Sequence, residues 1–415
     1  MDLLHQLQKA KKQRAKFAAL NLAQRNKILR DLAEMLKKYQ RQILQANARD
    51  LKNLARSSIK DRLLLNENRI QAMANGLLKV AKLPDPLNKI LEKRKLKNGL
   101  SLQKISVPLG TLAVIYESRP NVTVDLAGLA IKSGNALVLK GGSEAHASNK
   151  ILVELIHRAL KQRGLPSEVV YFIEPKDNWQ KTLLNAHGLV DVLIPRGSNA
   201  LIQWVRQNSR LPVIETGAGV CHIFVDNNVD VKKTVDIIIN AKTTGPAICN
   251  SLDTLVIHKE SLRDVLLAAS KRLAQHGVEI FADNDSHRVL EKIYPHQLLH
   301  KAKAADYGKE FLSLKMAIKT VKNFDEGLNF VKQKTSGHSE SILSNYNDHI
   351  KRFLKEVDAA CVYANVSTRF TDGEEFGMGA EVGISTQKLH ARGPMGLEAL
   401  TSYKWIAEGN WLTRK

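Results

Sequence analysis

Short continuous apolar runs alternate with segments of helical periodicity from residue 110 onward. The runs are 112–116, 136–139, 169–173, 190–194 and 213–214. Segments between them, such as 148–162 and 199–208, have the length of helices that cross over between strands. Strands that are apolar along both faces are typical of a parallel sheet covered by helices on both sides. The pattern therefore predicts an α/β fold.

A second α/β pattern follows residue 221. Residues 223–225 and 254–257 are predicted strands, and 231–241 and 262–276 are predicted helices. The final stretch, from about residue 366, is rich in glycine and ends in an apolar, aromatic tail. Such a tail is more typical of packing or of an oligomer strand than of a ligand site.

The N-terminal part of the chain has a different pattern. Residues 15 to 83 have helical spacing, with Asn21 as a plausible cap before the first long helix, and prolines at 84 and 86 end this block. Short alternating stretches around Lys97-Asn98-Gly99 then predict a hairpin within 88–109.

Composition limits the classes of function. The chain has 415 residues, of which 44% are hydrophobic, and a formal net charge of +22. Such a charge can indicate nucleic-acid or membrane-surface binding. The basic residues are scattered, however, and only 5% of residues are aromatic, so stacking platforms for bases are few. No apolar run approaches the roughly 18 residues of a membrane helix. We therefore expect neither a nucleic-acid nor a membrane partner.

The cysteines and histidines argue against disulfides and metals. Cys221, Cys249 and Cys361 are far apart and odd in number, which favours reduced thiols and a cytoplasmic protein. Cys221 and Cys361 each precede apolar residues and are predicted to pack in strands. The histidines show no metal-ligand spacing, so no metal site is predicted.

Cys249 is the candidate nucleophile. It ends the polar segment 241–250, which a glycine and a proline interrupt, and the apolar run 255–257 follows. A thiol at the end of a loop can become a reactive thiolate, whereas an isolated cysteine is more often a small buried hydrophobe. Both interpretations stay open from spacing alone. Asn250, together with neighbouring N–H groups, is a candidate oxyanion donor.

Two glycine-bearing turns are candidate phosphate sites. Lys140-Gly141-Gly142-Ser143-Glu144 and Arg196-Gly197-Ser198-Asn199 each follow a predicted strand and open a predicted helix. Backbone N–H groups and the helix dipole favour anions at such positions. The chain has neither a Gly-x-Gly-x-x-Gly fingerprint nor a P-loop, so each turn alone is also typical of an ordinary connection. Glu215 follows a predicted strand and is either a candidate base or a turn cap.

Several longer segments resemble one known family. They are 107–110 (VPLG), 115–125 (IYESRPNVTVD), 194–199 (IPRGSN), 249–250 (CN), 376–388 (FGMGAEVGISTQK) and 390–398 (HARGPMGLE). In these segments and their order, nearly the whole chain resembles the gamma-glutamyl phosphate reductases, a branch of the aldehyde dehydrogenase superfamily. The resemblance implies an aldehyde-dehydrogenase-like α/β fold, with a Rossmann-type cofactor domain, an α/β catalytic domain and a small oligomerisation element.

The resemblance also implies a reaction and its partners. The expected reaction is NADPH-dependent reduction of L-glutamyl 5-phosphate to L-glutamate 5-semialdehyde with release of phosphate, in proline biosynthesis in the cytoplasm. A homo-oligomer is expected, and glutamate 5-kinase is a candidate partner. The implied cofactor domain is 1–220, with a 92–108 hairpin for oligomerisation. The catalytic domain is 221–360, residues 361–390 return to the cofactor domain, and 391–415 form a substrate loop and an oligomerisation tail.

Functional residues carry over by position. Cys249 matches the nucleophile, and Asn121 matches the asparagine that shares the oxyanion hole with the cysteine N–H. The implied cofactor-binding residues are Lys140, Gly141, Gly142, Ser143, Gly197, Ser198, Glu375 and Phe376, the last two beside the nicotinamide ribose and ring. The implied substrate-binding residues are Arg119, Asn250, Arg392 and Gly393.

Position 245 departs from the pattern of the resembling family, and Glu215 bears on the direction of the reaction. Many family members have an arginine before the proline that precedes the nucleophile, whereas here Gly245 precedes Pro246. If that arginine binds the leaving phosphate, another cation must replace it. Glu215 lies 249 − 215 = 34 residues before the cysteine, like the water-activating glutamate of oxidising aldehyde dehydrogenases. A reductase gains nothing from hydrolysing its thioester, so Glu215 is predicted to be turned away or structural.

Two rival functions follow from the same residues. An NAD-dependent dehydrogenase that oxidises aldehydes would use Glu215 as its base and would need no phosphate. A basic nucleic-acid-binding protein on a retained dehydrogenase scaffold would bind DNA or RNA in a salt-sensitive way.

Overall fold

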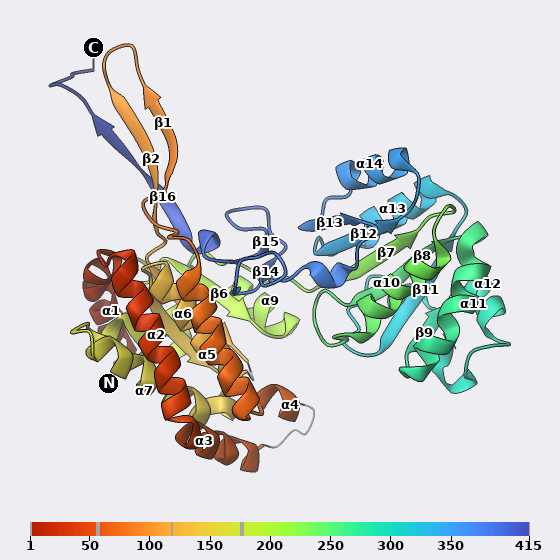
Figure 1. The fold of residues 1–415 in the computed structure, drawn as a ribbon, viewed down its shortest axis with the longest axis horizontal. Coiled ribbons are helices and arrows are strands. Elements are labelled where there is room, and N and C mark those ends of the chain that lie inside the picture. Colours follow the sequence, from red (N-terminus) through yellow and green to blue (C-terminus); the bar gives the residue numbers. More distant parts are fainter. Residues whose placement is uncertain (1, 55–58, 118, 175–177, 415) are drawn as a thin grey trace. The chain divides into compact units, whose positions relative to one another are not determined.

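The computed structural model describes residues 2–54, 59–117, 119–174 and 178–414 (Figure 1). The chain divides into two compact units. Unit 1 comprises Met1–Thr216, Gly377–Gly383 and Pro394–Lys415, and unit 2 comprises Gly217–Phe376 and Ile384–Gly393. The expected catalytic segment, 221–360, falls within unit 2, while the segments 361–390 and 391–415 are each divided between the two units.

Unit 1 begins with helices that cover a sheet. They are α1 (Leu3–Ala18), α2 (Leu22–Lys38), α3 (Gln40–Lys52), α4 (Lys60–Leu63) and α5 (Glu67–Lys82). The predicted cap at Asn21 is confirmed: its side chain accepts the N–H of Gln24, and the Gln24 side chain accepts the N–H of Asn21, both at 2.9 Å. α2 packs on α5 and on α7 (His146–Lys161), and its apolar stripe is buried.

The sheet of unit 1 is parallel, as the apolar runs predict. It contains β3 (Thr111–Tyr116), β4 (Ala136–Gly141), β5 (Val170–Phe172) and β6 (Val192–Arg196) in the order β5-β4-β3-β6. Its connections include α6 (Pro120–Lys132), α7 (His146–Lys161), α8 (Trp179–Leu184) and α9 (Asn199–Asn208). The predicted strand at 213–214 is reduced to a single bridge between Leu193 and Val213.

A separate antiparallel sheet of unit 1 joins the hairpin to the end of the chain (Figure 1). β1 (Ile90–Lys95) pairs with β2 (Ser101–Pro108), and β16 (Thr401–Glu408) pairs with the other edge of β2. The predicted turn is confirmed: Gly99 has φ +92°, and the N–H of Leu96 donates to the carbonyl of Leu100 at 2.8 Å. The apolar tail is therefore an edge strand.

Unit 2 is a second parallel α/β layer, which confirms the pattern after residue 221. Its sheet has the order β10-β9-β11-β8-β7-β12-β13. The strands are β7 (Cys221–Val225), β8 (Leu252–His258), β9 (Glu279–Ala282), β10 (Leu299–Lys301), β11 (Lys315–Val321), β12 (Ser339–Leu343) and β13 (Cys361–Ala364). The helices are α10 (Val231–Thr243), α11 (Lys259–Gln275), α12 (Asn284–Leu290), α13 (Phe324–Lys334) and α14 (Asn347–Glu356).

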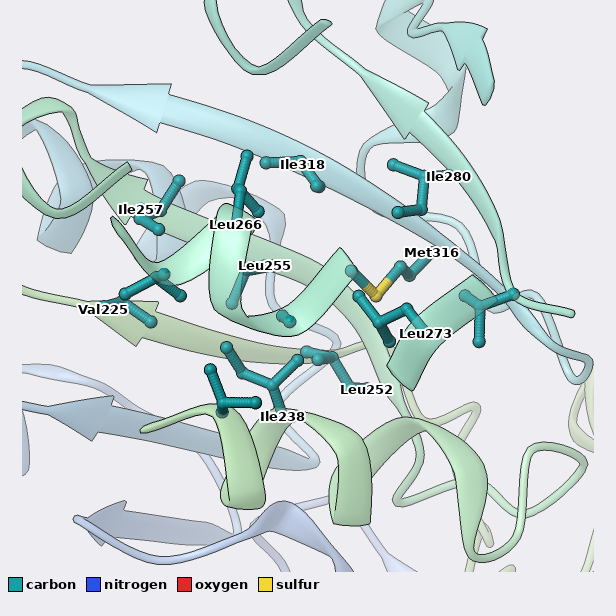
Figure 2. Packing of buried hydrophobic residues seen from close by; sticks show 14 of the residues in the cluster. Val225, Ile238, Leu252, Leu255, Ile257, Leu266, Leu273, Ile280, Met316 and Ile318 are labelled. Carbon is teal, nitrogen blue, oxygen red and sulfur yellow. The ribbon is translucent and has the colours of Figure 1, made fainter. Parts of the chain in front are cut away.

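The core of unit 2 lies between this sheet and the helices α10 and α11. Figure 2 shows Ile238 of α10 and Leu266 and Leu273 of α11 facing the apolar side chains of the sheet. Leu255 and Ile318 are fully buried in this cluster. The two-residue strands β14 (Ile384–Ser385) and β15 (Gly393–Pro394) come later in the chain. In the described part of the chain, none of the helices is both long and apolar enough to cross a bilayer.

Candidate functional site

The first candidate cofactor turn follows β4 and precedes α7. Lys140 is 8% exposed, and its Nζ donates to the carbonyl of Gly141 at 2.7 Å and lies 5.4 Å from the ring centre of Trp179. Burial lowers the pKa of Lys140, and the charge of Glu144 opposes this shift. A Cβ at Gly142 would lie 2.2 Å from Glu144 Oε1, so the carboxylate of Glu144 folds over this glycine. Ser143 begins the 3₁₀ turn that leads into α7.

The second turn, between β6 and α9, holds a carboxylate of the chain itself. Glu117 accepts hydrogen bonds from the N–H of Ser198 at 2.8 Å and from its hydroxyl at 3.1 Å. Ser198 also caps α9. A Cβ at Gly197 would lie 2.5 Å from Glu117 Oε2. The start of α9 therefore does bind an anionic group, and in this structure that group is the carboxylate of Glu117.

The start of α6 carries two further predicted residues. Arg119 is the N-cap of α6, and Asn121 lies in its first turn. Asn121 Nδ2 donates to Asp125 Oδ2 at 3.1 Å. Burial raises the pKa of Asp125, while Arg196 and this hydrogen bond oppose the shift. Ser118, in the middle of the 115–125 segment, lies outside the described residues.

Cys249 lies in a turn of unit 2 between the end of α10 and the start of β8. It is partly exposed, whereas Cys221 and Cys361 are buried, as predicted for them. The turn is closed by hydrogen bonds from Ile248 N to Gly245 O at 3.1 Å and from Ser251 N to Ile248 O at 3.0 Å. None of the three thiols forms a disulfide. The position of Cys249 agrees with the loop setting read from the sequence.

Asn250 joins the cysteine turn to the segment after β13. Its Nδ2 donates to the carbonyl of Thr371 at 2.9 Å and to that of Arg369 at 3.4 Å, and its own carbonyl accepts from the Thr368 hydroxyl at 2.7 Å. Its Oδ1 accepts from Arg369 Nη1. Asn250 is 1% exposed, so its amide positions the backbone beside Cys249. Its contact with substrate stays a prediction.

Buried charges lie beneath the same turn. Lys242 Nζ donates to Leu252 O at 2.6 Å and lies 4.0 Å from Asp253 Oδ1. Asp253 accepts the N–H of Phe311 at 3.0 Å and that of Cys221 at 3.5 Å. Burial raises the pKa of Asp253 and lowers that of Lys242, and the attraction between the two charges opposes both shifts.

Glu310 belongs to this assembly and was not predicted. It accepts the N–H of Gly219 at 2.9 Å. Gly219 packs directly against Cys249, since a Cβ there would lie 1.7 Å from the Cys249 carbonyl oxygen. The cysteine turn therefore packs against the segment that leads into β7, where the N–H groups of Gly219 and Cys221 donate to Glu310 and Asp253. The sequence carries no sign of this, because Glu310 lies in a loop far along the chain.

The remaining predicted residues of unit 2 lie in two places. Glu375 lines a cavity of about 320 Å³ with six other residues, and Phe376, the next residue, is 42% exposed. Arg392 Nη2 forms an ion pair with Asp358 Oδ1 at 2.8 Å, and Gly393 follows with φ +85°. Lys388 also pairs with Asp358, and both cations lower the pKa of that carboxyl. The structure thus brings Glu375 to a cavity and gives Arg392 a carboxylate partner.

Glu215 lies near an arginine of unit 1, and His338 is a buried histidine of unit 2. Glu215 Oε2 lies 3.7 Å from Arg206 Nη1 in unit 1. The described residues contain no group of three or more His, Cys, Asp or Glu side chains arranged to hold a metal ion. His338 is buried, with Nδ1 2.8 Å from the Ser339 hydroxyl and 3.8 Å from Cys221 Sγ. Burial lowers its pKa to about 4.

Arg369 is the site residue that sequence reasoning missed most clearly. It belongs to the 3₁₀ turn Thr368–Phe370, 369 − 249 = 120 residues after the cysteine in the chain. Its guanidinium contacts Asn250 and lies against Gly245. The only signal in the sequence was indirect. Because position 245 is a glycine, a cation near the cysteine would have to come from another residue.

Comparisons with known proteins agree with this architecture. The aldehyde dehydrogenase family profile matches residues 1–286. A gamma-glutamyl phosphate reductase of Legionella pneumophila (strain Paris) is 51% identical over 409 residues, which cover 98% of each chain. One from Chlorobium chlorochromatii is 50% identical over 390 residues, covering 94% of this chain and 93% of the relative.

A solved structure extends the likeness to three dimensions. The crystal structure of a gamma-glutamyl phosphate reductase from Thermotoga maritima has a TM-score of 0.95 and 40% identity, and each chain is covered completely. The likeness therefore spans both units. The chain belongs to the aldehyde dehydrogenase family and, within it, to the gamma-glutamyl phosphate reductases.

Proposed function

We propose that this chain reduces L-glutamyl 5-phosphate to L-glutamate 5-semialdehyde with release of phosphate, through a thioester on Cys249 and with NADPH as the cofactor. The observation that supports this most is the Cys249 turn. A partly exposed thiol lies in a backbone turn that Asn250 and Gly219 hold in place, next to a guanidinium. This is the setting in which a thiolate can act as a nucleophile.

The acyl-transfer step needs little from the protein beyond position and charge. The Cys249 thiolate attacks the carbonyl carbon of the acyl phosphate and forms a C–S bond. The C–O bond to the phosphoryl group then breaks, and its electron pair leaves with the phosphate. Because phosphate is a good leaving group, no strong acid is required. The Cys249 N–H and Asn121, as the resemblance implies, would stabilise the oxyanion, each by about 3 kcal/mol.

The residues around the two glycine turns of unit 1 fit a phosphate-bearing nucleotide. Lys140 is a buried cation at the end of β4, and a Cβ at Gly142 or Gly197 would meet the carboxylate of Glu144 or Glu117. The backbone N–H of Ser198 lies at the start of α9 and donates to the carboxylate of Glu117, as expected where a helix start favours negative charge. When bound, NADPH supplies the hydride that reduces the thioester to the aldehyde.

The aldehyde-oxidising alternative requires Glu215 to activate water. Glu215 instead has Arg206 as a neighbour within unit 1. Its side chain is thus held by a structural ion pair in unit 1, which favours the reductase.

The test of the proposed function is the reverse reaction of the purified chain. Glutamate 5-semialdehyde, inorganic phosphate and NADP are supplied, and NADPH absorbance is followed. We expect NADPH formation that depends on phosphate, with NAD a poorer acceptor than NADP. Turnover without phosphate would point to an oxidising dehydrogenase and would sink the proposal.

We also propose that the sheet of β1, β2 and β16 joins copies of the chain into a homo-oligomer. β16 is an edge strand, and Tyr403 and Trp405 on it are 53% and 45% exposed. Edge strands with exposed aromatic side chains are prone to pair with other chains. Trp405→Lys should lower the mass measured by light scattering, whereas an unchanged mass would refute this role. Whether glutamate 5-kinase binds the chain stays a prediction.

A further inference from the structure

Arg369 crosses from the segment after β13 to the cysteine turn. Its Nη1 donates to Asn250 Oδ1, and its Nε donates to the Thr244 hydroxyl at 3.3 Å. These two bonds fix the plane of the guanidinium between the end of α10 and the residue that follows Cys249. A guanidinium carries five N–H donors, so a group that makes these two bonds still has hydrogens to donate.

Gly245 is the counterpart of this arginine. A Cβ at 245 would lie 2.9 Å from Arg369 Nη2 and 3.0 Å from its Cζ. The guanidinium thus occupies the space into which any side chain at 245 would extend. Many members of the resembling family have an arginine at this position, whereas this chain has a glycine with the guanidinium of Arg369 lying against it.

The same guanidinium lines the cavity of about 320 Å³ next to the turn. Of the residues that line it, Arg369 alone is cationic, and Asp372, Glu374 and Glu375 are acidic. Asp372 Oδ1 accepts the N–H groups of Glu374 and Glu375 at 2.8 and 3.4 Å, so this carboxylate serves its own turn. Burial lowers the pKa of Arg369, and negative charge on Cys249 opposes this. An arginine stays charged at neutral pH even so.

We propose that Arg369 binds the phosphoryl group of the acyl phosphate through its guanidinium and holds the departing phosphate. This rests on the proposed function. As the thiolate attacks, negative charge accumulates on the phosphoryl oxygens when the C–O bond breaks, and a guanidinium fixed beside the nucleophile stabilises that charge. In the reverse direction the same contact holds inorganic phosphate against the thioester. Gly245 provides the space that this contact needs.

The test measures the KM for inorganic phosphate in the reverse reaction. Arg369→Ala should raise it by at least about 30-fold, because a charge-assisted hydrogen bond is lost, and leave the KM for NADP within about threefold. Arg263→Gln removes an exposed cation from α11 of the same unit and serves as the matched control. Arg369→Lys keeps the charge without the fork, so an intermediate KM is expected.

A swap makes the test specific. Gly245→Arg alone should reduce activity by crowding Arg369. Combined with Arg369→Ala, it puts a guanidinium back into the same space and should recover at least about tenfold of the lost phosphate affinity. If wild type turns over with phosphate but Arg369→Ala and Arg369→Lys keep its KM for phosphate within about threefold, the role of Arg369 is refuted and the proposed function survives. If wild type needs no phosphate, the proposed function itself fails.

Discussion

The candidate sites of the two units are built in opposite ways. In unit 1 the glycine turns are exposed or near the surface, and internal carboxylates, Glu144 and Glu117, fold over Gly142 and Gly197. In unit 2 the cysteine turn packs against buried polar groups, and Asn250 links it to the guanidinium of Arg369. A site for a bound and released cofactor can tolerate groups that move aside. A nucleophile must be fixed, and buried polar contacts fix it at a cost in stability.

The largest effect that this comparison predicts is a loss of folding stability in unit 2 as the pH falls. Burial depresses the pKa of His338 to about 4, so the folded chain resists a proton that the unfolded chain accepts near pH 6.5. Stability from this group is present above that value and is lost as pH falls towards 4, by up to about 3 kcal/mol. Urea unfolding at several pH values measures it.

The control for this slope is an exposed histidine of the same unit. His338→Gln should flatten the dependence between pH 6.5 and 4, whatever it does to the absolute stability. His276→Gln, at the exposed end of α11, should leave the slope as it is. An equal slope in wild type and His338→Gln would show that burial of His338 does not cause the loss of stability at low pH.

The next effect concerns Asn250. Asn250→Ala removes the amide bonds to the 369 and 371 carbonyls together with the acceptor for Arg369, so the cysteine turn should loosen and kcat should fall about 100-fold. Asn250→Asp keeps the acceptor and loses only the donors, and a smaller loss is expected. Activity near wild type in Asn250→Ala would show that the turn needs no such support.

A smaller and opposite effect is expected in unit 1. Glu117→Gln removes a negative charge from the start of α9, where phosphate is proposed to bind. The Kd for NADPH, measured by fluorescence titration, should fall about three- to fivefold, which matches the energy of one charge at a helix end. Glu154→Gln, on the exposed side of α7, is the control. Weaker NADPH binding in Glu117→Gln would assign that carboxylate a direct role in holding the cofactor.

The smallest effect is predicted for Glu215. Because it is paired with Arg206 and serves no step of the reduction, Glu215→Gln should leave kcat within about threefold of wild type. A loss of a hundredfold or more in the reduction assay would contradict this and would favour the oxidising chemistry.

The sequence predicts the fold well where local signals are strong. Continuous apolar runs predicted β3 and β4, and the helix 199–208 agrees with α9 residue for residue. The run at 213–214 formed only a bridge, because two apolar residues after a proline offer little pairing length. The place of Cys249 in a turn also followed from its local surroundings, whereas its partial exposure did not.

The supporting residues could not be predicted in this way. Arg369, Asp253 and Glu310 act on the cysteine turn through contacts that only the folding of distant segments brings together. Glu117 lies in the 115–125 segment that carries the resemblance. Nothing in that segment indicates its bond to Ser198, which joins the ends of two strands. Hydrophobic periodicity and turn residues carry no information about such pairs.

The most direct test of the account is a single-turnover burst. Purified chain is mixed with glutamate 5-semialdehyde and NADP without phosphate, and NADPH and the mass of the protein are followed for wild type and Cys249→Ala. We predict a burst of NADPH stoichiometric with the chain, an acyl adduct on Cys249, and steady turnover once phosphate is added. Continued turnover without phosphate, or an equal burst from Cys249→Ala, would contradict the proposal that Cys249 carries a thioester reserved for phosphate.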